Sequence, residues 1–364
     1  MKKYYNIEFF RFIFAVIIVY YHITHSAIMG YVGDNAVFLN MQTYSSLASA
    51  IVEYYLIISG FFLYISASRK KDKSFIELLF DKIVRLWPVL CFYSIIMVAF
   101  FNSNIQDAIL DLFFLRATGI SLNHTGIIWY IGPFFYCTLL IFAILKYTSK
   151  QKSMITISLM AYISYAMNLN MFEGKLGRKI IFSFISSAVL RVLGGLCVGV
   201  IVAALIEEYK IRFGNASGKE KKIYKVITTI IEILTILSLL NLFVYKKISV
   251  KNVFIIVIMF CILLICQLNE YGILSNLINK PFFGILGRYS YSIYVMQQIS
   301  FNILGKTFWK RKDFITNNEF LTIIISIVIS VCLGVITYHF VEQPAVRLYE
   351  KWKKHHGIIS GKNL

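Results

Sequence analysis

The chain has 364 residues, of which 58% are hydrophobic and only 15% are charged. Soluble globular domains are typically about 45–50% apolar and about 25% charged, so this composition excludes an ordinary soluble enzyme, a disordered chain, a coiled coil and a collagen-like chain. The formal net charge of +19 does not indicate nucleic-acid binding, because the basic residues lie in short segments between apolar runs, as in membrane proteins. We therefore predict an all-α, polytopic membrane protein with no nucleic-acid partner.

Ten apolar ranges of about 17–25 residues, the length that a bilayer core requires, follow one another along the chain. In order they are 9–29, 47–66, 86–102, 127–146, 154–172, 181–206, 226–245, 252–268, 282–304 and 320–341. The third and eighth ranges are short, and the sixth is long, which is typical of a tilted or broken helix. We expect about ten transmembrane helices and no appended soluble domain.

The distribution of basic residues predicts the orientation. With the N-terminus in the cytoplasm, the cytoplasmic segments carry more than twice as many Lys and Arg residues as the external segments, as the positive-inside rule requires. An even number of spans then returns the C-terminus to the cytoplasm. We expect a transmembrane domain over residues 1–345, a basic cytoplasmic tail over residues 346–364, and a multi-pass location in the cell (plasma or inner) membrane.

The first apolar range carries ionisable side chains that are costly at membrane depth and therefore indicate function. Arg11 and His22 are eleven residues apart, so at about 100° per residue they share one helix face and lie about 16 Å apart along the axis. Glu8 joins that face and can pair with Arg11 at the i,i+3 spacing. His25 lies one turn beyond His22, and we interpret it as structural. The alternative is that Arg11 reaches the membrane surface and that His22 is a satisfied interior histidine.

Three further ionisable residues lie in or beside the later ranges. Glu53 lies about two turns into the second range, and an antiparallel neighbour would bring it near His22, where a carboxylate fixes the imidazole tautomer. The alternative is a structural hydrogen bond between helices. Arg85 ends a basic segment, and we predict that it faces the cytoplasmic mouth and binds phosphate. Arg191 lies inside the sixth range and requires an anionic partner or a water-filled cavity. The neighbouring Gly194-Gly195 allows close helix approach.

Six short motifs along nearly the whole chain resemble those of the acyltransferase 3 family of bacterial membrane acyltransferases. Each is weakly specific alone, but their order, spacing and membrane positions are fairly specific together. They are Glu8-x-x-Arg11 with His22, Glu53 followed by Ser59-Gly60-Phe61, Lys82-x-x-Arg85-Leu86-x-Pro88, Trp129-Tyr130, Ser290-Tyr291-Ser292-x-Tyr294 and Glu342-x-Pro344. Two positions depart from the family pattern, because Gln297 stands where many members have His, and no acidic residue follows Trp129 closely.

The resemblance implies transfer of an acyl group, usually acetyl from acetyl-CoA, to a hydroxyl of a cell-surface polysaccharide or its lipid-linked precursor. It implies that Arg11 and Arg85, together with Arg191, bind the polyanionic donor, because guanidinium groups form forked hydrogen bonds to phosphate. His22 then takes the proton from the acceptor hydroxyl, oriented by Glu53 or Glu8. Alternatively, His22 carries the acyl group as a nucleophile. The donor is a substrate, so we expect no permanently bound cofactor and no metal site.

Aromatic side chains beside the motifs are candidates for contact with sugar or adenine. They are Trp129, Tyr130, Tyr289, Tyr291 and Tyr294, and we group the polar side chain of Gln297 with them. The expected partners are acyl-CoA, a glycan or lipid-linked glycan, and membrane lipid. The identity of the acceptor and the oligomeric state are not determined by the sequence.

Three other classes of membrane protein compete with this interpretation. A transporter or flippase of a glycan or another anionic substrate also buries Arg, His and Glu in its spans, but the motifs occur once and no internal two-fold repeat is visible. A polymerase or ligase of lipid-linked sugars has no need of a basic pocket for a nucleotide-bearing donor. A purely structural membrane protein leaves the aligned charges at Glu8 and Arg11 unexplained.

Overall fold

The computed structural model describes residues 3–27, 36–44, 46–69, 73–120, 126–171, 180–181, 185–213, 218–245, 250–269 and 272–356. These residues are almost entirely helical. An α-helix satisfies its backbone hydrogen bonds internally, which is what a segment in hydrocarbon must do. The helical prediction for the chain is therefore confirmed.

The described elements of the N-terminal half are helices and helical turns. They are α1 (Tyr5–His22), the π turn η1 (Ile23–Ala27), α3 (Ala36–Tyr44), the 3₁₀ turn η2 (Ser46–Ala50), α4 (Ile51–Arg69), α5 (Phe75–Phe101), α6 (Ile105–Leu112), α7 (Ile131–Tyr147) and α8 (Lys150–Met171).

The C-terminal half begins with two very short antiparallel strands, β1 (Ile180–Ile181) and β2 (Ile185–Ser186). The elements that follow are α9 (Ser187–Phe213), α10 (Gly218–Tyr245), α11 (Val250–Asn269), α12 (Ile273–Leu277), α13 (Pro281–Arg288), α14 (Ser290–Lys306), α15 (Lys312–Asn317), α16 (Glu319–Thr337), the π turn η3 (Tyr338–Glu342) and α17 (Gln343–His355).

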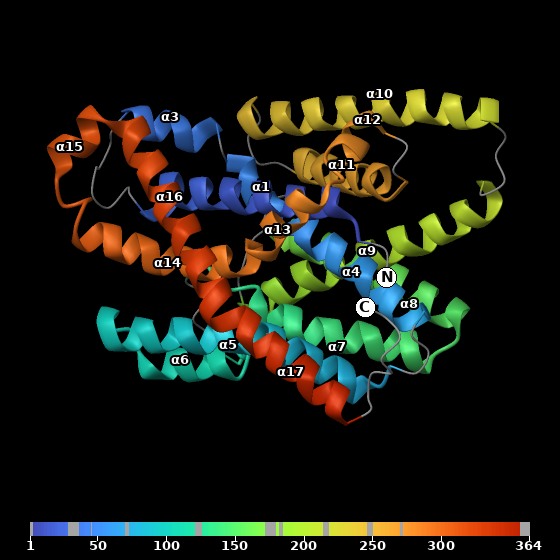
Figure 1. The fold of residues 1–364 in the computed structure, drawn as a ribbon, viewed down its shortest axis with the longest axis horizontal. Coiled ribbons are helices and arrows are strands. Elements are labelled where there is room, and N and C mark those ends of the chain that lie inside the picture. The colour runs from blue at the N-terminus through green and yellow to red at the C-terminus, as the bar shows by residue number, and fades with distance from the viewer. Residues whose placement is uncertain are drawn as a thin grey trace.

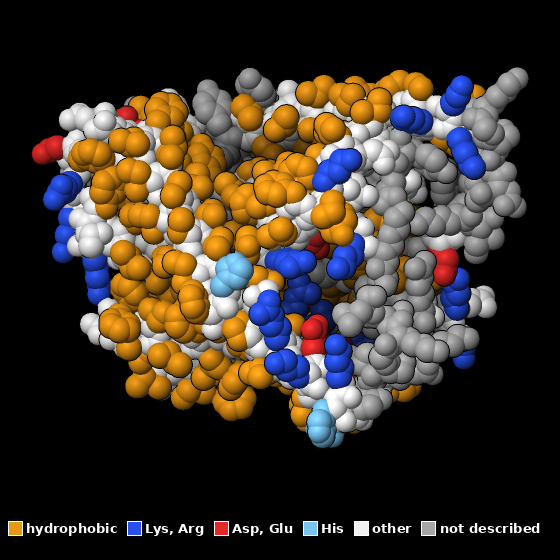
Figure 2. Space-filling view, in the orientation of Figure 1, with side chains coloured by type: hydrophobic (Ala, Val, Ile, Leu, Met, Phe, Trp, Pro, Cys, Tyr) orange, Lys and Arg blue, Asp and Glu red, His pale blue; other side chains and the backbone are white. Residues whose placement is uncertain are grey.

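Several of the longer helices run along the long axis of the molecule. Figure 1 shows α1, α5, α7, α10 and α14 in this direction, with α4, α9 and α16 crossing them obliquely. The most extensive helix contacts join α4 to α9, α8 to α9, α14 to α16 and α1 to α13. Large apolar side chains such as Tyr162, Phe320 and Phe340 remain exposed on the outside, and hydrophobic groups cover much of the face in Figure 2. Such an exterior is suited to lipid rather than to water.

Each of the ten predicted ranges overlaps a helix of at least 17 residues. By length and composition, seven helical segments of the described chain can cross a membrane: those that contain α1, α4, α5, α9, α10, α11 and α16. The helix α7 is apolar but has 17 residues. The helix α8 starts with four polar residues, and the range 282–304 is broken at Tyr289 between α13 and α14. Several helices able to cross a membrane are therefore present, as predicted, while the count of ten and the cytoplasmic termini stay predictions.

The helix α5 begins at Phe75, earlier than the predicted start of its range at 86. Ser74 caps its N-terminus, because the Ser74 hydroxyl accepts a hydrogen bond from the backbone N–H of Glu77 at 3.0 Å. The Ser-x-x-Glu spacing is a capping-box signature, which the apolar pattern alone does not register. A helix rather than a loop therefore positions Lys82 and Arg85.

The predicted tail is helical through most of its length, since η3 joins α16 to α17 and residues 346–355 belong to α17. Lys353 turns inward onto α5, where its Nζ lies 3.3 Å from Glu77 Oε1 and 2.5 Å from Asp81 Oδ1. The first part of the predicted tail is thus attached to the helix bundle. Residues 357–364 lie outside the described residues.

Candidate functional site

A cavity of about 650 Å³ lies among α1, α4, α5, α7 and α14. Its lining on α4 extends from Ser66 to Val52, which corresponds to about 21 Å along a helix axis. Lys73, Asp81, Lys82 and Arg85 line one end, which we call the charged end. Figure 2 shows Lys and Arg side chains gathered near the centre of the displayed face, beside α17.

The charged end contains two cations that form no ion pair with a described carboxylate, although Glu342 interacts electrostatically with Arg85. Asp81 is shared by two lysines, with Lys73 Nζ at 2.7 Å and Lys353 Nζ at 2.5 Å. Within the described part of the chain, neither Lys82 nor Arg85 has a carboxylate at ion-pair distance, and Lys82 Nζ lies 4.8 Å from the ring centroid of Phe134. Cations that face a cavity and lack a carboxylate at ion-pair distance favour binding of an anion there.

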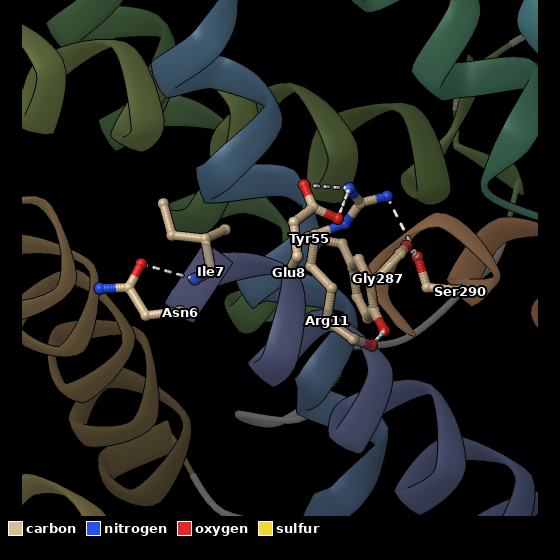
Figure 3. A network of polar contacts seen from close by, with 7 residues as sticks. All are labelled: Asn6, Ile7, Glu8, Arg11, Tyr55, Gly287 and Ser290. Carbon is tan, nitrogen blue, oxygen red and sulfur yellow. Dashed lines mark hydrogen bonds and ion pairs between the residues drawn. The ribbon is translucent and has the colours of Figure 1, made fainter. Parts of the chain in front are cut away.

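Arg11 also lines the cavity and is held by three helices (Figure 3). Its Nη1 lies 2.9 and 2.8 Å from the two carboxylate oxygens of Glu8, and its Nη2 donates to Ser290 Oγ at 3.1 Å. The Tyr55 hydroxyl of α4 donates to the backbone carbonyl of Arg11. The side chain of Arg11 is 16% exposed, so its guanidinium is fixed in place and remains open to the cavity.

Gly287 makes this arrangement possible. A Cβ at this position would lie 2.1 Å from Glu8 Oε2 and 2.6 Å from Glu8 Cα, so only glycine allows α13 to approach α1 this closely. The Gly287 carbonyl also accepts a hydrogen bond from Ser290 Oγ at 2.8 Å. Gly287 therefore leaves room for Glu8 and accepts the hydrogen bond of Ser290, and these are the two side chains that contact the Arg11 guanidinium.

The first helix presents one continuous face to the cavity. Glu8, Arg11, Ala15 and Ile18 line it, which is the three–four spacing expected of one helix face. His22 continues this face one turn beyond Ile18, about 6 Å further along the axis. Among the described residues of α1, Ile18 is the last that lines the cavity, so His22 lies just past its inner end.

His22 is connected to the cavity wall through α14. Its Nδ1 lies 3.0 Å from Oε1 of Gln297, and the Nε2 of Gln297 donates to the backbone carbonyl of Tyr294 at 2.8 Å. Tyr294 itself lines the cavity. The helix widens into the π turn η1 directly after His22, and such turns are frequent at functional sites. The described partner of the His22 ring is thus Gln297, rather than Glu53 or Glu8.

The structure pairs Glu53 with Arg191. Oε1 of Glu53 lies 2.6 Å from Arg191 Nε, and the Tyr165 hydroxyl donates to Oε2 at 2.5 Å. The requirement of Arg191 for an anionic partner is met by this carboxylate. Neither Glu53 nor Arg191 is among the residues that line the cavity, so this geometry gives no support to Glu53 as the partner of His22 or to Arg191 as a donor ligand.

The predicted aromatic contacts divide into two groups. Tyr130, Tyr291 and Tyr294 line the cavity, and the ring centroids of Tyr130 and Tyr294 lie 4.8 Å apart. The ring of Trp129 instead lies 5.0 Å from the guanidinium carbon of Arg191, so it packs against the buried ion pair. Tyr289 contacts His339 at 3.3 Å.

Three residues of the site were not singled out as candidates from the sequence. Lys82 and Ser290 line the cavity, and Glu342, at the π turn η3, accepts a hydrogen bond from Ser292 at 2.6 Å. Each of them belongs to one of the six motifs described above, and this membership is the sequence feature that could have identified it. What the sequence could not show is that the motif containing Ser292 and the motif containing Glu342 contact one another.

Comparison with known proteins identifies the family. A family model for an acyltransferase domain, that of acyltransferase family 3, matches residues 4–339. No curated protein and no solved structure matches the chain significantly. The matched range includes every residue that lines the cavity, together with His22 and Gln297. This chain, with its several membrane-spanning helices, therefore belongs to the acyltransferase 3 family of membrane acyltransferases.

Proposed function

We propose that the protein transfers an acyl group, most simply acetyl, from acyl-CoA to a hydroxyl of a cell-surface polysaccharide or of its lipid-linked precursor. The observation that carries the proposal is the cavity whose charged end holds two cations, Lys82 and Arg85, with no carboxylate at ion-pair distance in the described chain. The protein acts in the cell membrane, and the charged end faces the cytoplasm, where acyl-CoA is available.

The chemistry of the cavity is complementary to the donor. Coenzyme A carries its phosphates at one end and a flexible, largely uncharged arm that ends in the thioester. Lys82 and Arg85 offer charge-assisted hydrogen bonds to the phosphates. Beyond them the wall of α4 is mainly apolar, with Leu56, Phe62 and Leu63, which suits the arm. Arg11 lines the same cavity, and we place its positive charge near the thioester.

The transfer itself requires a proton acceptor at the inner end. The acceptor oxygen attacks the thioester carbonyl carbon, a C–O bond forms, the C–S bond breaks, and coenzyme A leaves as the thiol. His22 takes the proton of the acceptor hydroxyl, because a neutral imidazole is a suitable base near pH 7. The alternative in which His22 carries the acyl group transiently uses the same position. In both cases the acceptor approaches from the His22 side and the donor from the charged end.

The test uses the purified protein in lipid nanodiscs, with acetyl-CoA binding measured by calorimetry and transfer by release of coenzyme A. Arg85→Ala is expected to weaken donor binding roughly tenfold to a hundredfold, because a charged hydrogen bond is lost. His22→Ala is expected to bind the donor normally and to lose about 10²–10⁴-fold in transfer, the usual contribution of general acid–base catalysis.

The matched control is Lys221→Ala, since Lys221 is exposed on α10 and does not line the cavity. Equal donor affinity in Arg85→Ala and Lys221→Ala would contradict the donor site, and normal transfer by His22→Ala would contradict the base. Movement of a glycan without turnover of any acyl-CoA would favour the transporter class. Mass spectrometry of surface glycan from cells with and without the gene then identifies the acceptor by a mass difference of one acyl group.

A further inference from the structure

We propose that Gln297 is a positioning residue, which holds His22 in the tautomer with the proton on Nδ1 and thereby presents the lone pair of Nε2 as the proton acceptor. This inference rests on the proposed role of His22 in transfer. It assigns to Gln297 a task on α14 that is separate from contact with substrate, since Gln297 is fully buried and is not among the residues that line the cavity.

The orientation of the Gln297 amide follows from its backbone partner. Nε2 lies 2.8 Å from the carbonyl oxygen of Tyr294. A backbone carbonyl can only accept a hydrogen bond, so the amide end that faces it must be the NH₂ group. The other end of the amide, Oε1, therefore faces His22.

The orientation of the amide then determines the tautomer of the ring. Oε1 of Gln297 lies 3.0 Å from Nδ1 of His22, and an amide oxygen can only accept. Nδ1 must therefore carry the proton. In a neutral imidazole this leaves Nε2 unprotonated, with an available lone pair. The unprotonated nitrogen is the one that can act as a base or a nucleophile.

The packing around α14 fixes the helix segment that carries Gln297. Ser300 Oγ donates to the backbone carbonyl of Gln297 at 2.7 Å and lies 2.6 Å from Ser330 Oγ of α16. A Cβ at Gly334 of α16 would lie 2.6 Å from the Cα of Ile293, so these two helices are in close contact. The buried amide, bonded at one end to the Tyr294 carbonyl and at the other to the ring, holds the imidazole before the substrate arrives.

The experiment reads the tautomer directly in the full-length protein. Magic-angle-spinning NMR of ¹⁵N-histidine-labelled protein in lipid bilayers, at a pH where the ring is neutral, distinguishes the protonated from the unprotonated ring nitrogen. The His22 signals are assigned by their loss in His22→Ala. We expect a protonated Nδ1 and an unprotonated Nε2 in the wild-type protein.

Two substitutions separate positioning from packing. Gln297→Met keeps the length of the side chain without the amide, and we expect a mixture of tautomers and about tenfold lower kcat, the effect of one lost hydrogen bond, with an unchanged KM for acetyl-CoA. Gln297→Glu keeps an acceptor oxygen toward Nδ1, so we expect the Nδ1-protonated ring and part of the lost kcat to return. Gln298→Met is the matched control, because Gln298 is the next residue of α14 and its amide contacts Asn302.

A wild-type ring with its proton on Nε2 would overturn the inference, and this result needs no variant to fold. A normal kcat in Gln297→Met, or equal losses in Gln297→Met and Gln298→Met, would overturn it as well. The proposed function fails separately, through normal transfer by His22→Ala, whatever tautomer the NMR spectrum shows.

Discussion

The arginines near the membrane interior differ in how their charge is compensated. The side chain of Arg191 is 5% exposed and is paired with Glu53, whose side chain is 0% exposed. Arg85 is exposed at the cavity and has no carboxylate at ion-pair distance in the described chain, although Glu342 interacts with it electrostatically. Arg11 lies between these cases, since it pairs with Glu8 but stays open to the cavity. Because a buried charge requires full compensation, Arg191 serves the structure, whereas Arg85 and Arg11 can offer hydrogen bonds to a ligand.

The Glu53–Arg191 pair gives a prediction at this scale. Arg191→Met leaves a buried carboxylate without its counter-ion, so we expect the free energy of unfolding to fall by about 3–5 kcal/mol. The double variant Glu53→Gln/Arg191→Met removes both charges and is expected to recover much of this loss. Denaturant unfolding of the wild type, both single variants and the double variant in detergent measures the coupling. Strictly additive effects would contradict the pairing.

The close approach of α4 and α9 brings these two charges together. A Cβ at Gly60 would lie 2.0 Å from the carbonyl oxygen of Leu196, and a Cβ at Gly199 would lie 2.0 Å from that of Ile57. Glycines that let two backbones touch are the usual device of membrane helix pairs. The glycine of the Ser59-Gly60-Phe61 motif is thus explained by helix packing, because it lies where α4 contacts α9.

Substitution of Gly60 tests this helix contact. Gly60→Ala forces the two main chains apart, and we expect a loss of about 1–3 kcal/mol in unfolding free energy, as for other overpacked sites. Ser68→Ala adds no atom at an exposed position of the same helix and is expected to be neutral. Thermal unfolding in detergent compares the two variants. Equal melting temperatures for both would show that α4 and α9 do not approach as closely as described.

At the scale of the whole molecule, the cavity is assembled from five helices whose lining residues range from Glu8 to Tyr294. Its charged end is bordered by α5, onto which α17 is fastened through Lys353. The donor site therefore requires the N-terminal, central and C-terminal parts of the chain at once. For acyl-CoA to enter, this end must face the cytoplasm, which is the orientation that the positive-inside rule predicts.

Labelling with a membrane-impermeant maleimide tests the orientation. In a background without the six native cysteines, Lys354→Cys on α17 and Lys310→Cys after α14 each introduce one thiol at an exposed position. We expect Lys310→Cys to react in intact cells and Lys354→Cys to react only after the membrane is opened. The opposite pattern would place the charged end of the cavity outside the cell and would contradict entry of the donor from the cytoplasm.

The sequence by itself determined the helical membrane class, the family, and the face of the first helix that carries Glu8 and Arg11. These properties depend on local quantities, namely the length and composition of apolar runs and the period of one helix. The start of α5 was also encoded locally, in Ser74 and Glu77, but the apolar pattern used to delimit the ranges does not detect a capping box.

Only the tertiary structure decided which side chains meet. Glu53 was expected beside His22 because consecutive helices are often neighbours. Instead, α4 packs chiefly on α9, where Glu53 forms an ion pair with Arg191. His22 and Gln297 are 275 positions apart, and no periodicity connects them. The pairing of distant polar groups depends on close contact between helices, which glycines permit at Gly60, Gly199, Gly287 and Gly334, and that contact exists only once the bundle has formed.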